Sequence, residues 1–139
     1  MKPIFGLLAM AAIAFAMPAF AADTLYADMG GQAVIDRLVD VSVDNYLADD
    51  RIKTIFDESN MDRIRAEFKV QFCQVAGGPC VYTGHDMTAA HKGLHLTNAD
   101  FNAVVEDLQA AMNTCDIPFR VQNRFLARLA PYQHQVVTR

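Results

Sequence analysis

Apolar residues recur every three or four positions over most of the chain beyond residue 24, which is the spacing of amphipathic helices. In the stretch 32–48, for example, Val34, Leu38 and Val41 fall on one face. No stretch keeps the strict alternation that is typical of a half-buried strand. The pattern therefore predicts an all-α protein. Helices are expected at about 32–48, 60–76, 87–94, 97–115 and 119–131, with a short segment at 51–56 between the first two.

Boundary signals agree with these segments. Asn60 is a favourable N-cap, and Gly77-Gly78-Pro79 is expected to end the helix that Asn60 begins. Thr97-x-x-Asp100 resembles a capping box, with Asp in place of the usual Glu or Gln. Pro131 is expected to bend or end the last helix, because a proline removes one backbone hydrogen bond.

The first residues are typical of an export signal. Lys2 precedes an uncharged apolar run at 4–16, which Pro18 interrupts, and Ala19-Phe20-Ala21 has the small-x-small pattern of a cleavage site. We expect residues 1–21 to be a signal peptide and the mature protein to be periplasmic or secreted. An uncleaved membrane anchor is the alternative, because residues 4–22 carry no charge and nearly reach the length of a membrane span.

Cleavage would leave one domain, residues 22–139, of 118 residues with 11 basic and 16 acidic side chains. We expect no stable membrane insertion of this mature chain. The sequence pI is about 5.4 and no basic patch is present, so a nucleic-acid-binding function is excluded.

The three cysteines leave two interpretations open. Cys73 and Cys80 can form a disulfide only if the chain turns between them, and the Gly77-Gly78-Pro79 segment can supply that turn. They are equally well interpreted as two small buried apolar residues. With Cys115 the count is odd, so at least one thiol stays free or pairs outside the chain.

Among four histidines, His91 has the best context for chemistry. Met87 and Leu94 share its helical face, so its imidazole would emerge from an apolar patch. A haem needs an apolar slot and one neutral imidazole, whose other ring nitrogen is usually held by a backbone carbonyl. A zinc site is less well supported by the sequence. His95 lies four residues after His91 and could be a second ligand, but the H-E-x-x-H pattern is missing and Gly93 weakens the helix.

An ordered set of residues around His91 resembles the proximal-histidine segment of the group I truncated haemoglobins. The set is Gly77-Gly78-Pro79, Tyr82-Thr83-Gly84, Met87, Ala90-His91 and Leu94. Further similarities are Leu25-Tyr26 with Gly30-Gly31, Asp49-Asp50-Arg51-Ile52-Lys53 with Phe56, Phe101-x-x-Val104 with Leu108, and Ile117-Pro118. The resemblance extends from Thr24 to Val137 without large gaps.

This resemblance implies a two-over-two helical sandwich, a shortened globin that binds haem b through iron ligation by His91. It also implies that Phe56 packs on the haem ring and that the pocket is lined by Ile64, Phe68, Met87, Leu94, Phe101 and Val104. Lys53, Arg65 and Lys69 are candidates for pairing with the haem propionates, with solvated surface charges as the alternative.

The distal side departs from the family pattern. Many members carry a tyrosine and a glutamine where this chain has Val43 and Ile64, neither of which can donate a hydrogen bond. Tyr46 lies about one turn beyond the expected tyrosine, and we expect it mainly to pack in the core. Gln71 is the other candidate donor, and Glu67 stands where some relatives carry a second iron-binding histidine.

Some relatives attach haem covalently through a histidine of the last helix. His134 lies one residue from that position in this chain. Because His134 does not coincide with the attachment position, we expect haem to be held without a covalent bond to the polypeptide.

Two functions follow from the resemblance. The first is reversible binding of oxygen or nitric oxide outside the cytoplasm, with an unidentified reductant keeping the iron ferrous. The alternative is a haem-dependent peroxidase or nitric-oxide-detoxifying enzyme on the same fold. Peroxide chemistry usually needs a distal acid–base residue, which Val43 and Ile64 do not offer. We therefore expect a binding protein and not an enzyme.

Overall fold

The computed structural model describes residues 25–138, and the regular structure in this part is entirely helical. The proposed signal peptide, residues 1–21, lies outside the described residues. No helix within 25–138 combines the length and apolar character needed to cross a membrane. In chain order the elements are α1 (Leu25–Asp28), α2 (Gly31–Ala48), η1 (Lys53–Phe56), α3 (Met61–Val75), α4 (Met87–Ala90), α5 (Asn98–Thr114), α6 (Phe119–Leu129), η2 (Ala130–Tyr132) and α7 (Gln133–Val136).

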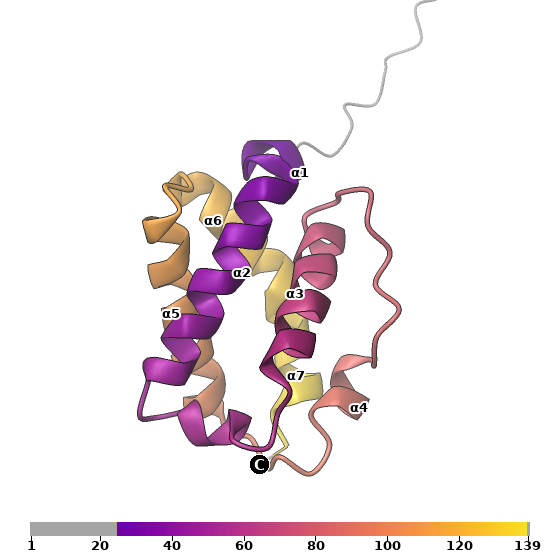
Figure 1. Ribbon diagram of the computed structural model, residues 1–139, viewed down its shortest axis with the longest axis vertical. Coiled ribbons are helices and arrows are strands. Elements are labelled where there is room, and N and C mark those ends of the chain that lie inside the picture. The colour runs from indigo at the N-terminus through magenta and orange to yellow at the C-terminus, as the bar shows by residue number, and fades with distance from the viewer. Residues whose placement is uncertain (1–24, 139) are drawn as a thin grey trace, which may run out of the picture.

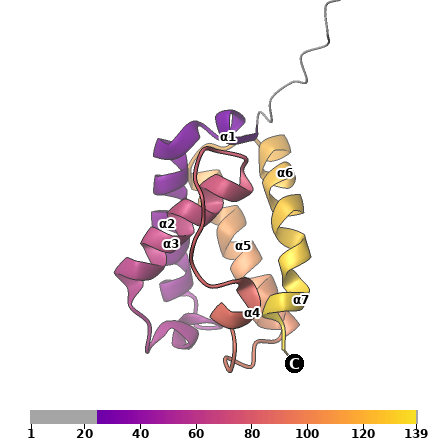
Figure 2. The ribbon, with the colours of Figure 1, turned by 90° about the vertical axis from the view of Figure 1, so that its right-hand side faces the viewer.

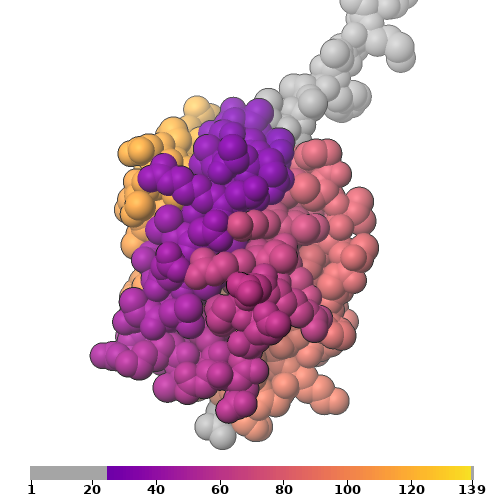
Figure 3. Space-filling view, viewed as in Figure 1, coloured from indigo at the N-terminus to yellow at the C-terminus, as the bar shows by residue number. Residues whose placement is uncertain are grey.

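The four long helices form two pairs, α2 with α3 and α5 with α6, and α2 packs against both α3 and α5 (Figure 1). Figure 2 shows that the long connection after α3 runs along the outside of this sandwich before it reaches α4. The side chains of α2, η1 and α3 cover one face of the molecule (Figure 3). The predicted all-α class and two-over-two arrangement are confirmed.

The predicted helix starts are also confirmed. The Asn60 side chain accepts a hydrogen bond from the backbone N–H of Arg63, at 3.0 Å. Thr97 and Asp100 form a reciprocal capping box, in which the Asp100 carboxylate accepts from the Thr97 N–H at 2.8 Å and the Thr97 hydroxyl accepts from the Asp100 N–H at 3.2 Å. Asp therefore satisfies the same backbone donor that Glu or Gln usually does.

The helix that leads to His91 is shorter than predicted. We expected about two turns over 87–94, but α4 ends at Ala90 and His91 is its C-terminal cap residue. The chain then turns, with the Leu94 N–H donating to the His91 carbonyl at 3.2 Å, and Gly93 and His95 both adopt positive φ. A glycine that adopts the left-handed conformation without strain ends a helix readily, and this accounts for the difference.

Between α3 and α4, the chain reverses and is closed by a disulfide. Cys73 and Cys80 are bonded, with their α-carbons 5.8 Å apart, so the first of the two interpretations is correct. Gly77 makes the turn at φ +81°. Gly78 is required for a different reason, because a β-carbon there would approach the Tyr26 ring to 2.5 Å and the Cys73 sulfur to 2.8 Å. Cys115 is a buried free thiol.

Most of the hydrophobic core lies toward the end of the sandwich at which α1 lies, which we call the packed end. There it contains the first half of α2, the last turns of α3 and α5, and α6, and it continues along α2 to Tyr46 and then to Ile52. Its most deeply buried large side chains include Leu25, Ile35, Leu38, Met112 and Phe125. At the opposite end, called the cavity end, α4 and α7 lie close to one another and border a cavity.

Candidate functional site

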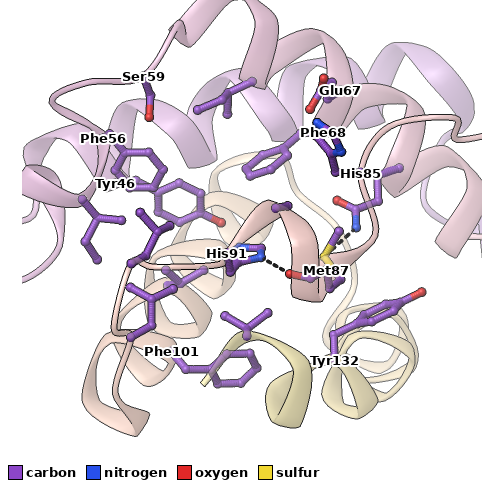
Figure 4. Close-up of a pocket in the computed structure, with 18 of the residues that line it drawn as sticks. Tyr46, Phe56, Ser59, Glu67, Phe68, His85, Met87, His91, Phe101 and Tyr132 are labelled. Carbon is purple, nitrogen blue, oxygen red and sulfur yellow. Dashed lines mark hydrogen bonds between the residues drawn. The ribbon is translucent and has the colours of Figure 1, made fainter. Parts of the chain in front are cut away.

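An apolar cavity of about 480 Å³ opens at the cavity end (Figure 4). Its walls come from the last turns of α2, from η1, α3 and α4, from the first half of α5 and from the C-terminal segment. The eight residues singled out by the sequence all line this one cavity. They are Phe56, Ile64, Phe68, Met87, His91, Leu94, Phe101 and Val104.

His91 is half-buried at the end of α4, and its ring orientation is fixed. Its Nδ1 lies 2.7 Å from the Met87 carbonyl oxygen, one turn earlier (Figure 4). A carbonyl only accepts, so in the neutral ring Nδ1 carries the proton and Nε2 keeps its lone pair. This is the arrangement of an imidazole that serves as a metal ligand through Nε2.

Aromatic contacts stiffen the wall opposite α4. The rings of Phe56 and Tyr46 stack with centroids 6.0 Å apart and an interplanar angle of 6°. The rings of Phe68 and Phe72 stack at 5.8 Å, and Phe72 meets Phe125 of the core edge-on at 5.2 Å. The cavity wall is therefore continuous with the packed end, which holds its shape.

The few polar groups at the cavity are mostly engaged with one another. The Gln71 amide donates to the Met87 sulfur at 3.3 Å, and Glu67 forms an ion pair with Arg63 at 2.8 Å. Tyr82 donates from its hydroxyl to the backbone carbonyl of His85 at 3.0 Å. A cavity with such walls suits a large, flat and mostly apolar cofactor.

Residues 24–138 match the family described as Bacterial-like globin. The chain belongs to the bacterial-like globin family. Among its relatives is the group 1 truncated hemoglobin of Tetrahymena pyriformis, which is 33% identical over 100 residues that cover 72% of this chain and 83% of the relative. The group 1 truncated hemoglobin GlbN of Synechocystis is 38% identical over 99 residues, covering 68% and 80%.

Solved structures agree with this assignment. The truncated hemoglobin of Tetrahymena pyriformis, solved in the Fe(III) form, superposes with a TM-score of 0.80 at 28% identity, covering 83% of this globin and 98% of that chain. The 2/2 hemoglobin of Synechococcus, solved in the cyanomet state with covalently attached heme, gives a TM-score of 0.78 at 25% identity, with 83% and 98% covered.

The three cations considered for propionate binding do not reach the cavity of this globin. Lys53, Arg65 and Lys69 lie outside it, in ion pairs with aspartates of α2 or of the turn after it, Asp50, Asp44 and Asp40 respectively. Helical spacing placed these cations on α3 and η1 but did not reveal that α2 turns its acidic face toward them. Among the described residues that line the cavity, Arg63 is the only Lys or Arg.

The C-terminal wall was missed by the sequence reasoning. Leu129, Tyr132 and Val136 line the cavity, whereas His134 between them is exposed and points elsewhere. The three- and four-residue spacing of these side chains was a signal that could have been used, but Pro131 suggested that the helix stopped. The short helix η2 connects α6 to α7, so helical structure continues past Pro131.

Tyr46 was assigned mainly to core packing, and the structure gives it a second place. It is only 2% exposed, yet it also lines the cavity. Val43, one turn earlier, is fully buried and does not line the cavity. Burial raises the pKa of Tyr46 well above its ordinary value, so its hydroxyl keeps its proton.

Proposed function

We propose that this globin binds haem b in the apolar cavity, that His91 is the protein ligand to the iron, and that the bound haem reversibly takes up a diatomic gas, oxygen or nitric oxide. The observation that supports this most directly is the 2.7 Å contact between His91 Nδ1 and the Met87 carbonyl, which leaves Nε2 available at the wall of an apolar cavity. Haem iron needs a neutral imidazole held in one orientation.

The residues that line the cavity fit a haem group. The cavity volume lies in the range of cofactor sites, and most of its lining is aliphatic or aromatic. The proposed contacts of the ring are Phe56, Ile64, Phe68, Met87, Leu94, Phe101 and Val104. Arg63 is the cation that replaces Lys53, Arg65 and Lys69 as the proposed partner of the propionates, because it lines the cavity.

Haem, when bound, would supply the iron atom that takes up diatomic gases. The chain's own part is to hold that ligand, exclude water with apolar walls and limit which polar groups reach the gas. We favour reversible binding over a peroxidase or a nitric-oxide-detoxifying enzyme, because Val43 and Ile64 offer no acid–base side chain at the two distal positions. An electron donor for the iron, of unidentified nature, belongs to the same proposal.

We also propose that the globin works outside the cytoplasm, after cleavage before Ala22. The Cys73–Cys80 disulfide supports this, since disulfides persist mainly in oxidising compartments. N-terminal sequencing of protein recovered from the cell envelope is expected to begin at Ala22. An intact Met1 end would instead favour the membrane-anchored alternative.

The ligand assignment is tested by removing the imidazole. His91→Gly, reconstituted with haem, is expected to lose the absorption spectrum of a histidine-ligated globin and to regain it when imidazole is added, because free imidazole can occupy the vacated position. His134→Ala is the matched control, since His134 is exposed and does not line the cavity. A His91→Gly spectrum identical to that of the wild type would remove His91 from the site.

A further inference from the structure

The segment that leads to His91 has little packing of its own. From residue 81 to residue 90 no side chain is fully buried, and only Tyr82 and Met87 are half-buried. A second hollow, of about 360 Å³, lies between α3 and the connection that follows it, with Ala66 and Thr83 among its lining residues. Apart from the contact of α4 with α7, the position of this segment therefore depends on a few discrete attachments.

The last two turns of α3 hold the returning chain at three points. One attachment is the disulfide, and the other two are hydrogen bonds made by glutamine side chains. The members on α3 lie within residues 71–74, and their partners are spread over residues 80–87. The attachments are Cys73–Cys80, Gln74–Tyr82 and Gln71–Met87.

The two glutamines use opposite ends of their amide groups. Gln74 Oε1 accepts a hydrogen bond from the backbone N–H of Tyr82 at 2.6 Å, and that N–H can only donate. Gln71 Nε2 donates to the Met87 sulfur at 3.3 Å, and a thioether sulfur can only accept. A glutamate in place of either glutamine keeps the acceptor but loses the donor. It would therefore preserve the Gln74 attachment and break the Gln71 attachment.

Met87 connects the Gln71 attachment to His91. Its side chain receives the hydrogen bond from Gln71, and its backbone carbonyl oxygen lies 2.7 Å from His91 Nδ1 (Figure 4). Holding the Met87 side chain limits movement of the first turn of α4, and with it movement of this carbonyl. An imidazole whose Nδ1–H is firmly hydrogen-bonded is a more basic metal ligand through Nε2.

We infer that Gln71 and Gln74, together with the Cys73–Cys80 disulfide, are positioning residues for His91. They hold the start of α4 so that the Met87 carbonyl keeps the imidazole in one orientation. The inference rests on the proposed haem site and names the residues that set the strength of its protein ligand. Loss of an attachment weakens the bond between His91 and iron and lets haem leave sooner.

The test replaces each glutamine by leucine and by glutamate, at about pH 8 where carboxylates are ionised. In the ferrous protein, the iron–histidine stretching band is expected at lower frequency and broader in Gln71→Leu, Gln71→Glu and Gln74→Leu. Gln74→Glu is expected to keep the wild-type band, because its carboxylate still accepts from the Tyr82 N–H. Haem transfer to excess apomyoglobin is expected to be about two- to tenfold faster in the same three variants.

The control for the charge change is Gln109→Glu. Gln109 is half-buried on α5 and does not line the cavity, so both readouts are expected to stay at wild-type values. A wild-type band in Gln71→Leu and Gln74→Leu would overturn the inference. A Gln74→Glu variant as impaired as Gln74→Leu would overturn the role of Gln74 as an acceptor, and a wild-type band in Gln71→Glu would overturn that of Gln71 as a donor.

The disulfide has its own arm of the test. Cys73→Ala/Cys80→Ala is expected to speed haem transfer by at least about threefold, because the connection is released from α3. Cys115→Ala, which leaves the disulfide intact, is the control and is expected to keep the wild-type rate. Equal transfer rates in the paired variant and the wild type would overturn the role of the disulfide in positioning.

A measurement on haem-free protein separates this inference from the haem site itself. Amide hydrogen exchange at residues 81–91 is expected to be about two- to tenfold faster in Gln71→Leu and Gln74→Leu than in wild type. Unchanged exchange would overturn the attachments whether or not haem binds. A wild-type protein that takes up no haem would refute the proposed function and the role toward iron, while faster exchange in the variants would still support the attachments.

Discussion

The packed end and the cavity end are built from the same helices but use their apolar side chains differently. At the packed end Ile35, Leu38 and Phe125 are completely buried against other side chains. At the cavity end Leu94 is 44% exposed, and Ile64 and Phe101 are half-buried with their inner surfaces facing the cavity. The packed end therefore stabilises the ligand-free fold through close packing, whereas a ligand bound at the cavity end would bury further apolar surface there.

The difference between the two ends is tested most strongly by matched truncations in ligand-free protein. Phe125→Ala is expected to lower the free energy of unfolding by about 3–5 kcal/mol, because it leaves a void in a close-packed core. Phe101→Ala is expected to cost roughly half of that or less, because its ring already borders a cavity. Urea unfolding followed by circular dichroism measures both values. Equal losses at the two sites would contradict the division.

Adding haem to the same two variants sharpens the comparison. We expect haem to stabilise Phe125→Ala about as much as wild type, and Phe101→Ala less, because Phe101 is a proposed contact of the ring. At a free haem concentration a thousandfold above Kd, mass action would add about 4 kcal/mol to a protein with an intact site. Unfolding midpoints with and without haem give the difference, and an equal gain in all three proteins would contradict the proposed contact.

The Cys73–Cys80 disulfide lies at the packed end, where it anchors the start of the connection to α4 on the last turn of α3. The paired variant Cys73→Ala/Cys80→Ala is expected to lose about 2–3 kcal/mol of stability, because the unfolded chain regains the freedom of an open loop. Unfolding in urea without reductant provides the measurement. Cys115→Ala, which removes the buried free thiol, is the control and is expected to keep the stabilisation that the disulfide provides. A paired variant as stable as the wild type would contradict this role of the disulfide.

Much of the fold could be predicted because helix periodicity and caps are local properties. The Asn60 cap and the Thr97–Asp100 capping box depend only on residues three positions apart, and both appear as expected. The length of α4 could not be predicted in the same way. Whether Gly93 weakens a helix or ends it depends on where the chain must go next, and that is decided by tertiary contacts.

The candidate site was only partly accessible from the sequence. Phe68 and Phe101, which the family resemblance assigned to the pocket, do line the cavity. Helix periodicity alone would fit a core position equally well. Arg63 and Lys69 could not be told apart, since both lie on α3 and only the packing of α2 decides which one meets an aspartate. Tyr46 both packs in the core and lines the cavity. Residue spacing alone cannot indicate that one side chain does both.

The central claim is that the His91 imidazole, held through Nδ1 by the Met87 carbonyl, is the protein ligand of haem iron. Resonance Raman spectroscopy of the ferrous, gas-free protein tests it most directly, because the iron–histidine stretching band reports that bond alone. The account predicts the band in wild type and in His134→Ala, and its loss in His91→Gly. A band that persists unchanged in His91→Gly without added imidazole would contradict the claim.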